Sequence, residues 1–342
     1  MSNHNFYRQL RSILKRESVV LATIVKVLGS APREVGAKMA ICRDSSIIGT
    51  IGGGAGEGKV VKKALDLFKI EEKQLVEIDL TGAPNRDIQG VCGGKVRIWL
   101  EKWSGKSAIA LADEILQVFE TGQSADLITP FTKNTKPYLI CDRVRANGCS
   151  PVPYTSARFV ETIQPQPILL IIGGGHVAVS LAQIASFAGF QIAVQDDRSE
   201  FVTPQRFPQA AFLSASITEI LDIAVHSQLY VALVTRGYPQ DIEALKALLQ
   251  YPIAYRYLGA IGSQKRITMI LQALTKQGIP SERLENFYAP IGLDIGALTP
   301  EEIAVSICGE LIKVRRGGTG LSLCDRLQDS TRSRVHLSHF GV

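Results

Sequence analysis

The sequence has no Cys-x-x-Cys pair and no group of cysteine and histidine residues at zinc-site spacing. Its six cysteines are scattered over positions 42, 92, 141, 149, 308 and 324. We expect free thiols rather than a disulfide framework, because disulfides are rare in cytoplasmic proteins. The cysteine content therefore predicts no structural zinc site.

Long apolar segments are also missing. No run of roughly eighteen consecutive apolar residues occurs, which excludes a membrane-spanning helix. Residues 1–18 contain basic residues but no apolar stretch after them, so they do not form a signal peptide. We expect a cytoplasmic protein without a membrane partner.

The net charge is small. The 38 Lys and Arg residues against 32 Asp and Glu residues leave +6 over 342 residues, which does not require a nucleic-acid partner. Residues from Lys313 onward supply +4 of this charge, and we expect 316–342 to form a solvated basic tail. Hydrophobic residues make up 46% of the chain, as in an ordinary globular protein.

Two domains are expected from the length, at about 100–200 residues per domain. Prolines at 151, 153, 165 and 167 mark the boundary. They predict an N-terminal domain over 1–150, a linker over 151–167 and a C-terminal domain over 168–315. Hydrophobic periodicity in the first domain predicts mixed α/β structure. Its expected helices are 3–17, 57–69 and 107–121, and its expected strands are 19–29, 37–42, 46–51, 75–80, 95–103, 125–131 and 137–141.

The second domain alternates strictly between strands and helices. Expected strands are 168–172, 191–195, 210–213, 229–234 and 255–261, and expected helices are 176–188, 217–224, 239–250 and 264–276. This alternation is typical of a doubly wound parallel sheet. The fold class is therefore α/β, with a mixed N-terminal domain followed by a Rossmann-like C-terminal domain.

A dinucleotide-type motif follows the first strand of the second domain. Gly173, Gly175 and Ala178 fit the pattern GxGxxA, and Asp196 lies 23 residues after Gly173. The glycines allow backbone N–H groups to approach a pyrophosphate at a helix N-terminus. We expect Asp196 to accept hydrogen bonds from ribose hydroxyls, as in domains that bind NAD or another adenine nucleotide.

Other residues belong to this predicted site. Gly174 and His176 complete the loop. The Asp196 carboxylate would repel a 2′-phosphate, which favours NAD or another adenosine ligand over NADP, and Arg198 weakens that inference. After the later strands, Arg236 and Arg266, with Lys265 beside the latter, are candidates for an anion site. The alternative is that Lys265 and Arg266 are ordinary solvated residues of a first helical turn.

A glycine-rich loop in the first domain nearly matches a P-loop. Residues 53–60 read GGAGEGKV, and Val60 stands where a P-loop has its Mg²⁺-binding hydroxyl. We therefore expect no ATP hydrolysis here. A series of free N–H groups before a helix is still suited to a phosphate or carboxylate.

Cys92 lies in a second glycine-rich loop, with the sequence Gly-Val-Cys-Gly-Gly over 90–94. Flanking glycines give the thiol open backbone access and room for a ligand. The other interpretation is a small buried hydrophobic residue at a turn, which the residues alone favour.

Together these segments resemble the XdhC/CoxI family, the xanthine dehydrogenase accessory factors, over about residues 10–318. In the first domain the matching segments are 29–39, 49–54 with Glu57, and 90–101. In the second they are 171–198, 234–238, 257–266 and the long block 289–312. The family has an N-terminal cofactor-associated domain and a C-terminal Rossmann domain.

The resemblance implies a role in the maturation of molybdenum hydroxylases. Members are thought to bind the molybdenum cofactor, protect it during sulfuration by a cysteine desulfurase, and deliver it to the target enzyme. The implied partners are a molybdenum hydroxylase client and a cysteine desulfurase, with a homodimer as one option. This implies a cofactor chaperone rather than an enzyme.

The resemblance also assigns a site. Cys92 is the implied metal contact, and the only candidate for a reactive residue. The residues implied to hold the pterin phosphate are Gly53, Gly54, Glu57, Arg33 and Lys38.

Two positions depart from the family pattern. Ala55 replaces the cysteine that usually follows this Gly-Gly-Gly, and Tyr238 replaces a common histidine. The first change removes one of two thiols expected near a metal.

Two other functions remain open. An NAD(P)-dependent oxidoreductase would need a proton donor, for which His176, Tyr238 and Asp241 are candidates. No Tyr-x-x-x-Lys pair supports that alternative. A scaffold that only recruits partners would bind no ligand.

Overall fold

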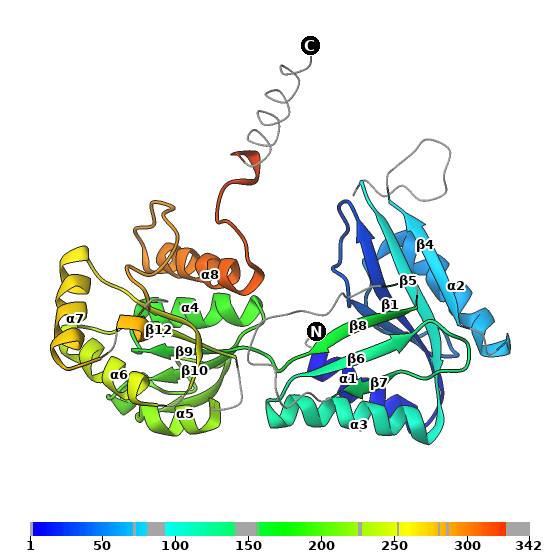
Figure 1. Ribbon diagram of the computed structural model, residues 1–342, viewed down its shortest axis with the longest axis horizontal. Coiled ribbons are helices and arrows are strands. Elements are labelled where there is room, and N and C mark those ends of the chain that lie inside the picture. Colours follow the sequence, from blue (N-terminus) through cyan, green and yellow to red (C-terminus); the bar gives the residue numbers. More distant parts are fainter. Residues whose placement is uncertain are drawn as a thin grey trace, which may run out of the picture. The chain divides into compact units, whose positions relative to one another are not determined.

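The computed structural model describes residues 3–70, 73–80, 93–140, 155, 157–224, 228–251, 253–279, 281–284 and 287–325. The chain divides into two compact units, Met1–Pro165 and Gln166–Val342 (Figure 1). The first unit is mixed α/β, and the second contains a parallel sheet. The predicted fold class is confirmed.

The first unit is built on a five-stranded antiparallel sheet in the order β3-β2-β1-β5-β4. These strands are β1 (Val19–Leu28), β2 (Lys38–Ile41), β3 (Ile47–Gly49), β4 (Gln74–Asp79) and β5 (Lys95–Trp103). The central strand β1 is a run of β-branched and aliphatic residues, and its first seven residues are buried. Helices on both faces of the sheet account for this burial.

Alternate residues of β1 face different helices. Val19 and Leu21 belong to a cluster with α1 (Asn3–Leu14) and α3 (Gly105–Thr121). Val20 and Ala22 belong to a cluster with α2 (Gly54–Ile70). Because successive strand side chains point to opposite faces, α1 and α3 cover one face and α2 covers the other.

A smaller antiparallel sheet in the order β7-β6-β8 completes the first unit. It consists of β6 (Ala125–Pro130), β7 (Tyr138–Ile140) and β8 (Arg158–Ile163). The sequence did not predict β8, which lies in the range assigned to the linker. Strand β8 pairs with β6, which lies about thirty residues earlier in the chain, and this pairing places Glu161 opposite Leu127.

The second unit contains a six-stranded parallel sheet in the order β11-β10-β9-β12-β13-β14. This is the 3-2-1-4-5-6 order of dinucleotide-binding domains. The strands are β9 (Ile168–Ile172), β10 (Gln191–Gln195), β11 (Ala210–Ser214), β12 (Leu229–Leu233), β13 (Tyr255–Ala260) and β14 (Phe287–Tyr288). The predicted doubly wound sheet is confirmed.

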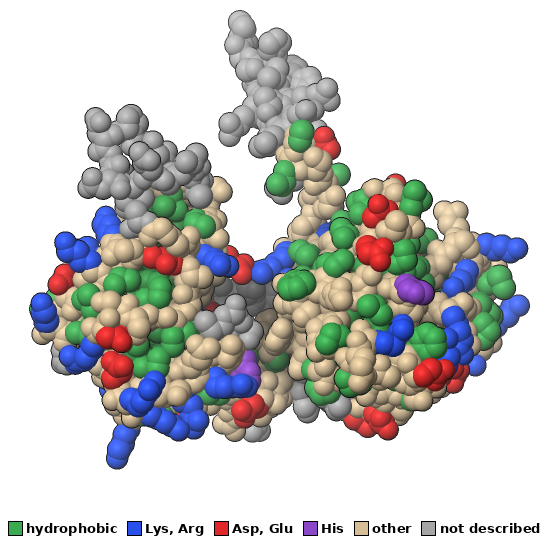
Figure 2. Space-filling view, turned by 180° about the vertical axis from the view of Figure 1, so that it is seen from behind, with side chains coloured by type: hydrophobic (Ala, Val, Ile, Leu, Met, Phe, Trp, Pro, Cys, Tyr) green, Lys and Arg blue, Asp and Glu red, His purple; other side chains and the backbone are tan. Residues whose placement is uncertain are grey.

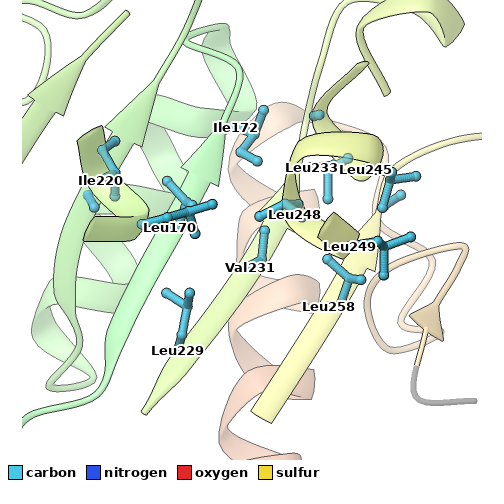
Figure 3. Packing of buried hydrophobic residues seen from close by; sticks show 14 of the residues in the cluster. Leu170, Ile172, Ile220, Leu229, Val231, Leu233, Leu245, Leu248, Leu249 and Leu258 are labelled. Carbon is cyan, nitrogen blue, oxygen red and sulfur yellow. The ribbon is translucent and has the colours of Figure 1, made fainter. Parts of the chain in front are cut away.

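Helices cover both faces of this sheet. On one face lie α5 (Ile217–Ala224), α6 (Tyr238–Gln250) and α7 (Gln264–Lys276), and on the other lie α4 (His176–Phe187) and α8 (Pro300–Arg316). Figure 3 shows the first layer, in which buried side chains from the strands meet those of α5 and α6. The labelled residues are Leu170, Ile172, Ile220, Leu229, Val231, Leu233, Leu245, Leu248, Leu249 and Leu258.

Helix α8 was not predicted as an element, although its end signals are in the sequence. Thr299 and Glu302 form a reciprocal capping box, and Pro300 stands in the first turn. The helix ends at Gly317, whose φ of 67° is favourable for glycine.

The surface is mixed in charge on the face that Figure 2 shows. In the first unit, at the left of Figure 2, Lys and Arg side chains are interspersed with Asp and Glu. None of the helices among the described residues combines the length and the apolar character of a membrane-spanning segment.

Candidate functional site

A cavity of about 390 Å³ opens in the second unit at the carboxyl ends of the central strands. Strand order reverses between β9 and β12, and ligands of doubly wound sheets bind at such a reversal. Residues that line the cavity include Gly173, Asp196, Asp197, Ser216, Thr218 and Arg236, together with Gln240, Glu243, Ala244 and Ala247 of α6.

Neighbouring backbone leaves no room for a side chain at two of the three glycines in the loop after β9. Gly173 has a φ of +108°, and a Cβ there would lie 2.6 Å from the carbonyl oxygen of Val234. A Cβ on Gly174 would lie 2.8 Å from the carbonyl oxygen of Phe201. Gly175 is different, because a Cβ there would meet nothing within 4 Å.

Gly175 is also the N-cap of α4, and no side chain caps the helix. The first-turn N–H groups are therefore not satisfied by a capping side chain, which suits an anion. His176, the first residue of α4, is exposed at this end.

Asp196 is buried at the end of β10 and holds the loop. Its carboxylate accepts hydrogen bonds from the backbone N–H of Gly174 (2.7 Å) and Arg198 (3.0 Å). The Arg198 guanidinium adds two more, both at 2.9 Å. Burial acts to raise the pKa of Asp196, but the hydrogen bonds from Arg198 and Gly174 outweigh it and hold the pKa well below its usual range.

The three cations expected to form an anion site do not act together. Arg236 makes a bidentate ion pair with Asp197, with both distances at 2.7 Å. Arg266 pairs with Asp241 on α6, whereas Lys265 is exposed. Of the three, only Arg236 lines the cavity.

Asp241 is fully buried and forms a network between α6 and α7. Its carboxylate accepts hydrogen bonds from the Thr235 hydroxyl (2.6 Å) and the Arg266 Nε (2.7 Å). Burial raises the pKa of Asp241, although the bonds from Thr235 and Arg266 act in the opposite direction. Because Thr235 lines the cavity, this network fixes the position of one cavity wall.

The residues considered as proton donors for an oxidoreductase are not gathered in the cavity. His176, Tyr238 and Asp241 are all absent from its lining. Asp241 is already engaged by Arg266, and Tyr238 packs against the hydrophobic cluster of the sheet.

In the first unit, glycine-rich loops meet at one end of the five-stranded sheet. A Cβ on Gly52 would lie 2.9 Å from the Pro32 ring, and a Cβ on Gly94 would lie 2.2 Å from the Ser30 carbonyl oxygen. The loop after β1 therefore contacts both the turn before α2 and the residues before β5. The predicted metal contact, Cys92, lies outside the described residues, and Gly93 follows it directly.

The turn before α2 has an unusual backbone. Gly53 and Gly54 have φ of +82° and +69°, and a Cβ on either would meet nothing within 4 Å. Both residues thus leave open space above the beginning of α2. The sequence singled out these two glycines, and the structure places them side by side at this helix end.

Glu57 holds this turn through three hydrogen bonds to one carboxylate oxygen. The donors are the Thr50 hydroxyl (2.5 Å), the Ile51 N–H (3.0 Å) and the Gly53 N–H (2.9 Å). Burial acts to raise the pKa of Glu57, but these bonds outweigh it and lower the pKa. The described contacts thus give Glu57 a positioning role.

The two cations named for this loop differ. Lys38 forms a buried ion pair with Glu161 of β8 and donates to the Gly36 carbonyl at 3.0 Å. Arg33 is exposed, and the structure records no ion pair for it among the residues that it describes. Over the same residues, no group of three His, Cys, Asp or Glu side chains could hold a metal ion.

Two family models match the chain, one in each unit. The model described as the XdhC and CoxI family matches residues 13–79, and the model described as the XdhC Rossmann domain matches residues 169–311. Together the two matches cover more than half of the chain.

Three curated relatives align with most of the chain. The protein YqeB of Escherichia coli is 28% identical over 305 residues, which are 88% of this chain but only 44% of YqeB. A relative from Bacillus subtilis, described as a probable xanthine dehydrogenase subunit, is 28% identical over 335 residues, 91% of this chain and 98% of the relative. The molybdenum cofactor insertion chaperone PaoD of Escherichia coli is 25% identical over 307 residues, 90% of this chain and 86% of PaoD.

A solved structure shares the fold. It is described as a xanthine dehydrogenase from Bacillus halodurans, and it covers 94% of this chain with a TM-score of 0.73. The identity is 24%, so this likeness concerns the fold alone.

Proposed function

The chain belongs to the XdhC and CoxI family, and on this premise we propose that it binds the molybdenum cofactor and delivers it to a molybdenum-containing hydroxylase. The observation that carries the proposal is the similarity, through both units, to a relative described as a molybdenum cofactor insertion chaperone. The client would be an enzyme of the xanthine dehydrogenase type, since the description of another relative names that enzyme.

The glycine-rich end of the first unit is the proposed cofactor site. Gly53 and Gly54 leave the beginning of α2 open, and a helix N-terminus favours the pterin phosphate. Arg33 is the nearby cation that we assign to this phosphate, because Lys38 is committed to Glu161. Glu57 would act indirectly, by fixing the turn.

We assign Cys92 to the molybdenum atom. A thiolate is a soft ligand that suits a metal already bound by sulfur. Gly93, the next residue, belongs to the loops that meet at this end of the sheet, which supports the assignment. Ala55 supplies no second thiol, so Cys92 would make the protein's contact alone.

Replacement of Cys92 by serine is expected to lower cofactor retention about tenfold, which corresponds to about 1.4 kcal/mol. Molybdenum by mass spectrometry and pterin by fluorescence after acid oxidation, both on protein co-produced with an active cofactor pathway, measure the retention. The matched control is Cys324→Ser, which removes an exposed thiol elsewhere. Equal retention by the Cys92 and Cys324 variants would show that Cys92 is only a packed residue.

Sulfuration is the finer part of this proposal. A cysteine desulfurase would supply sulfur from its persulfide while the chain holds the cofactor. The sulfur would replace a terminal oxygen, which would leave as water, and a thiol reductant would supply the two electrons. Cyanide-releasable sulfur in the same samples tests this step. It should appear only when the desulfurase is co-produced, and its presence without the desulfurase would contradict the step.

We further propose that the second unit binds an adenine nucleotide, NAD or a related compound. The cavity beside Asp196 would take the adenosine half, and the uncapped first turn of α4 would take the phosphates. The strand order and the open side of Gly175 support this placement.

Gly175→Val should abolish nucleotide binding and leave the unit folded. The valine side chain would project into open space over the first turn of α4, where a phosphate must approach closely. Calorimetric titration with NAD, NADP, AMP and ATP measures the effect. Gly58→Val, at an equally open glycine of α2, is the control that should bind normally. Unchanged binding by the Gly175 variant would place the ligand elsewhere.

A further inference from the structure

Four charged side chains meet beside the nucleotide cavity. Asp196, Asp197 and Arg198 follow β10, and Arg236 follows β12. In dinucleotide-binding domains an acidic side chain at this point accepts hydrogen bonds from the two free ribose hydroxyls. Such a role requires carboxylate oxygens with lone pairs to spare.

The Asp196 carboxylate already accepts four hydrogen bonds, two on each oxygen. Its Oδ1 accepts from the N–H and Nε of Arg198, and its Oδ2 accepts from the N–H of Gly174 and the Nη2 of Arg198. Each oxygen therefore accepts as many hydrogen bonds as it has lone pairs, and a ribose hydroxyl would have to share an acceptor position with Arg198 or Gly174. The Asp196 side chain is also only 3% exposed.

Arg198 is held firmly in this arrangement. Its guanidinium carbon lies 3.7 Å from the centre of the Phe201 ring, in addition to its bidentate pair with Asp196. Arg206 approaches the same ring at 5.0 Å and donates to the Gly174 carbonyl at 2.7 Å. Displacement of Arg198 by a ribose would break two charge-assisted hydrogen bonds and a cation–π contact.

Among the residues that the structure describes, Arg236 is the one cation that lines the cavity, whose lining also includes Asp196, Asp197 and Glu243. Arg236 lines the cavity with its side chain 40% exposed, and its Nη1 lies 3.8 Å from Asp196 Oδ1. Its partner Asp197 is 58% exposed, so this carboxylate has room to turn toward solvent. Ser216 and Thr218 line the same cavity, and their hydroxyl oxygens lie 2.8 Å apart in a hydrogen bond with each other.

From these contacts we infer that the cavity takes an adenine nucleotide with a phosphate on its ribose, of the NADP type, rather than one with a free ribose diol. Arg236 would bind this phosphate. Arg198 would neutralise the Asp196 carboxylate and occupy its acceptor sites. The inference rests on the proposed nucleotide binding, and it reverses the preference that Asp196 suggests in the sequence. Arginine is the side chain that accommodates a 2′-phosphate in such domains.

Titration of the full chain with 2′,5′-ADP and with 5′-AMP isolates the 2′-phosphate, by which alone the two probes differ. We expect 2′,5′-ADP to bind at least about tenfold more tightly, as charge-assisted hydrogen bonds to arginine would give. NADP and NAD should follow the same order. Arg236→Gln should weaken 2′,5′-ADP binding much more than 5′-AMP binding and so remove most of this preference.

Lys246→Gln is the matched control, since it removes a charge from α6 at a position that does not line the cavity. AMP binding that equals or exceeds 2′,5′-ADP binding would overturn the inference and leave nucleotide binding intact. An unchanged preference in Arg236→Gln would overturn the role of Arg236. Failure of all four nucleotides to bind would overturn the nucleotide site itself.

Discussion

Replacement of Arg266 by alanine is expected to lower the free energy of unfolding of the second unit by about 3–5 kcal/mol, because it strands a buried charge. Asp241 is completely buried, and Arg266 supplies two nitrogens, at 2.7 and 2.5 Å, to its Oδ2. The hydrogen bond from the Thr235 hydroxyl alone would not offset the cost of burying the charged Asp241 carboxylate. Denaturant unfolding followed by far-ultraviolet circular dichroism measures the loss.

The loss should depend on pH in a defined direction. Burial raises the pKa of Asp241, and removal of Arg266 should raise that pKa further. The native state of the variant would then bind more protons than the unfolded state, so its stability falls as pH rises between the unfolded and native pKa values. The deficit should therefore be largest near neutral pH and smaller in mild acid.

Lys265→Ala is the control for this experiment, because Lys265 is the exposed neighbour of Arg266 on the same helical turn. Its effect should stay within about 0.5 kcal/mol. Both tryptophans, Trp99 and Trp103, lie in the first unit, so tryptophan fluorescence does not report the transition of interest. A loss below about 1 kcal/mol for Arg266→Ala would mean that the pair behaves like a surface ion pair.

Gly173→Ala is expected to destabilise the second unit by about 3 kcal/mol or more, through backbone strain and overpacking together. The φ of +108° at Gly173 is outside the range that side chains tolerate. The added methyl group would also lie 2.6 Å from the Val234 carbonyl oxygen, which is backbone and has little freedom to move. Thermal and denaturant unfolding both measure this effect.

Gly175→Ala, two residues further on, is the matched control. Its φ of −73° is ordinary, and its Cβ would meet nothing within 4 Å. We expect a loss of about 1 kcal/mol or less, the difference between glycine and alanine at an N-cap. Equal losses at 173 and 175 would show that loop glycines are required for a reason other than close approach and positive φ.

Local patterns predicted most of the elements. Four elements have the bounds that their periodicity predicts, namely the strands over 95–103 and 191–195 and the helices over 217–224 and 264–276. These segments have clear hydrophobic periodicity and definite ends. The doubly wound parallel sheet of the second unit also follows from strand–helix alternation, whereas the order of its strands does not.

Pairing between distant residues could not be predicted in this way. Strand β8 becomes a strand by pairing with β6, and its own composition is mixed. Lys38 was expected to meet a phosphate, yet its nitrogen meets Glu161, 123 residues away. No periodicity in the sequence encodes such a partner.

The hydrogen-bond partners of two acidic residues in the candidate sites could not be predicted from the sequence either. Glu57 was assigned to the cofactor, and the structure shows it holding the turn before α2. An acidic residue in the first turn of a helix is a signal for capping that the sequence did contain. Asp196 follows β10 and lines the cavity, and only the structure shows that Arg198 donates to both of its oxygens.

The most direct measurement of the proposed delivery is the transfer of molybdenum from this chain to a cofactor-free hydroxylase of the xanthine dehydrogenase type. The chain, purified with its bound cofactor, is mixed with the hydroxylase, the two proteins are separated, and the molybdenum in each is quantified over time. We expect molybdenum to leave the chain and appear in the hydroxylase in equal amount, with a matching gain of hydroxylase activity. A chain that retains no molybdenum after co-production, or one whose molybdenum never reaches the hydroxylase, would contradict the proposal.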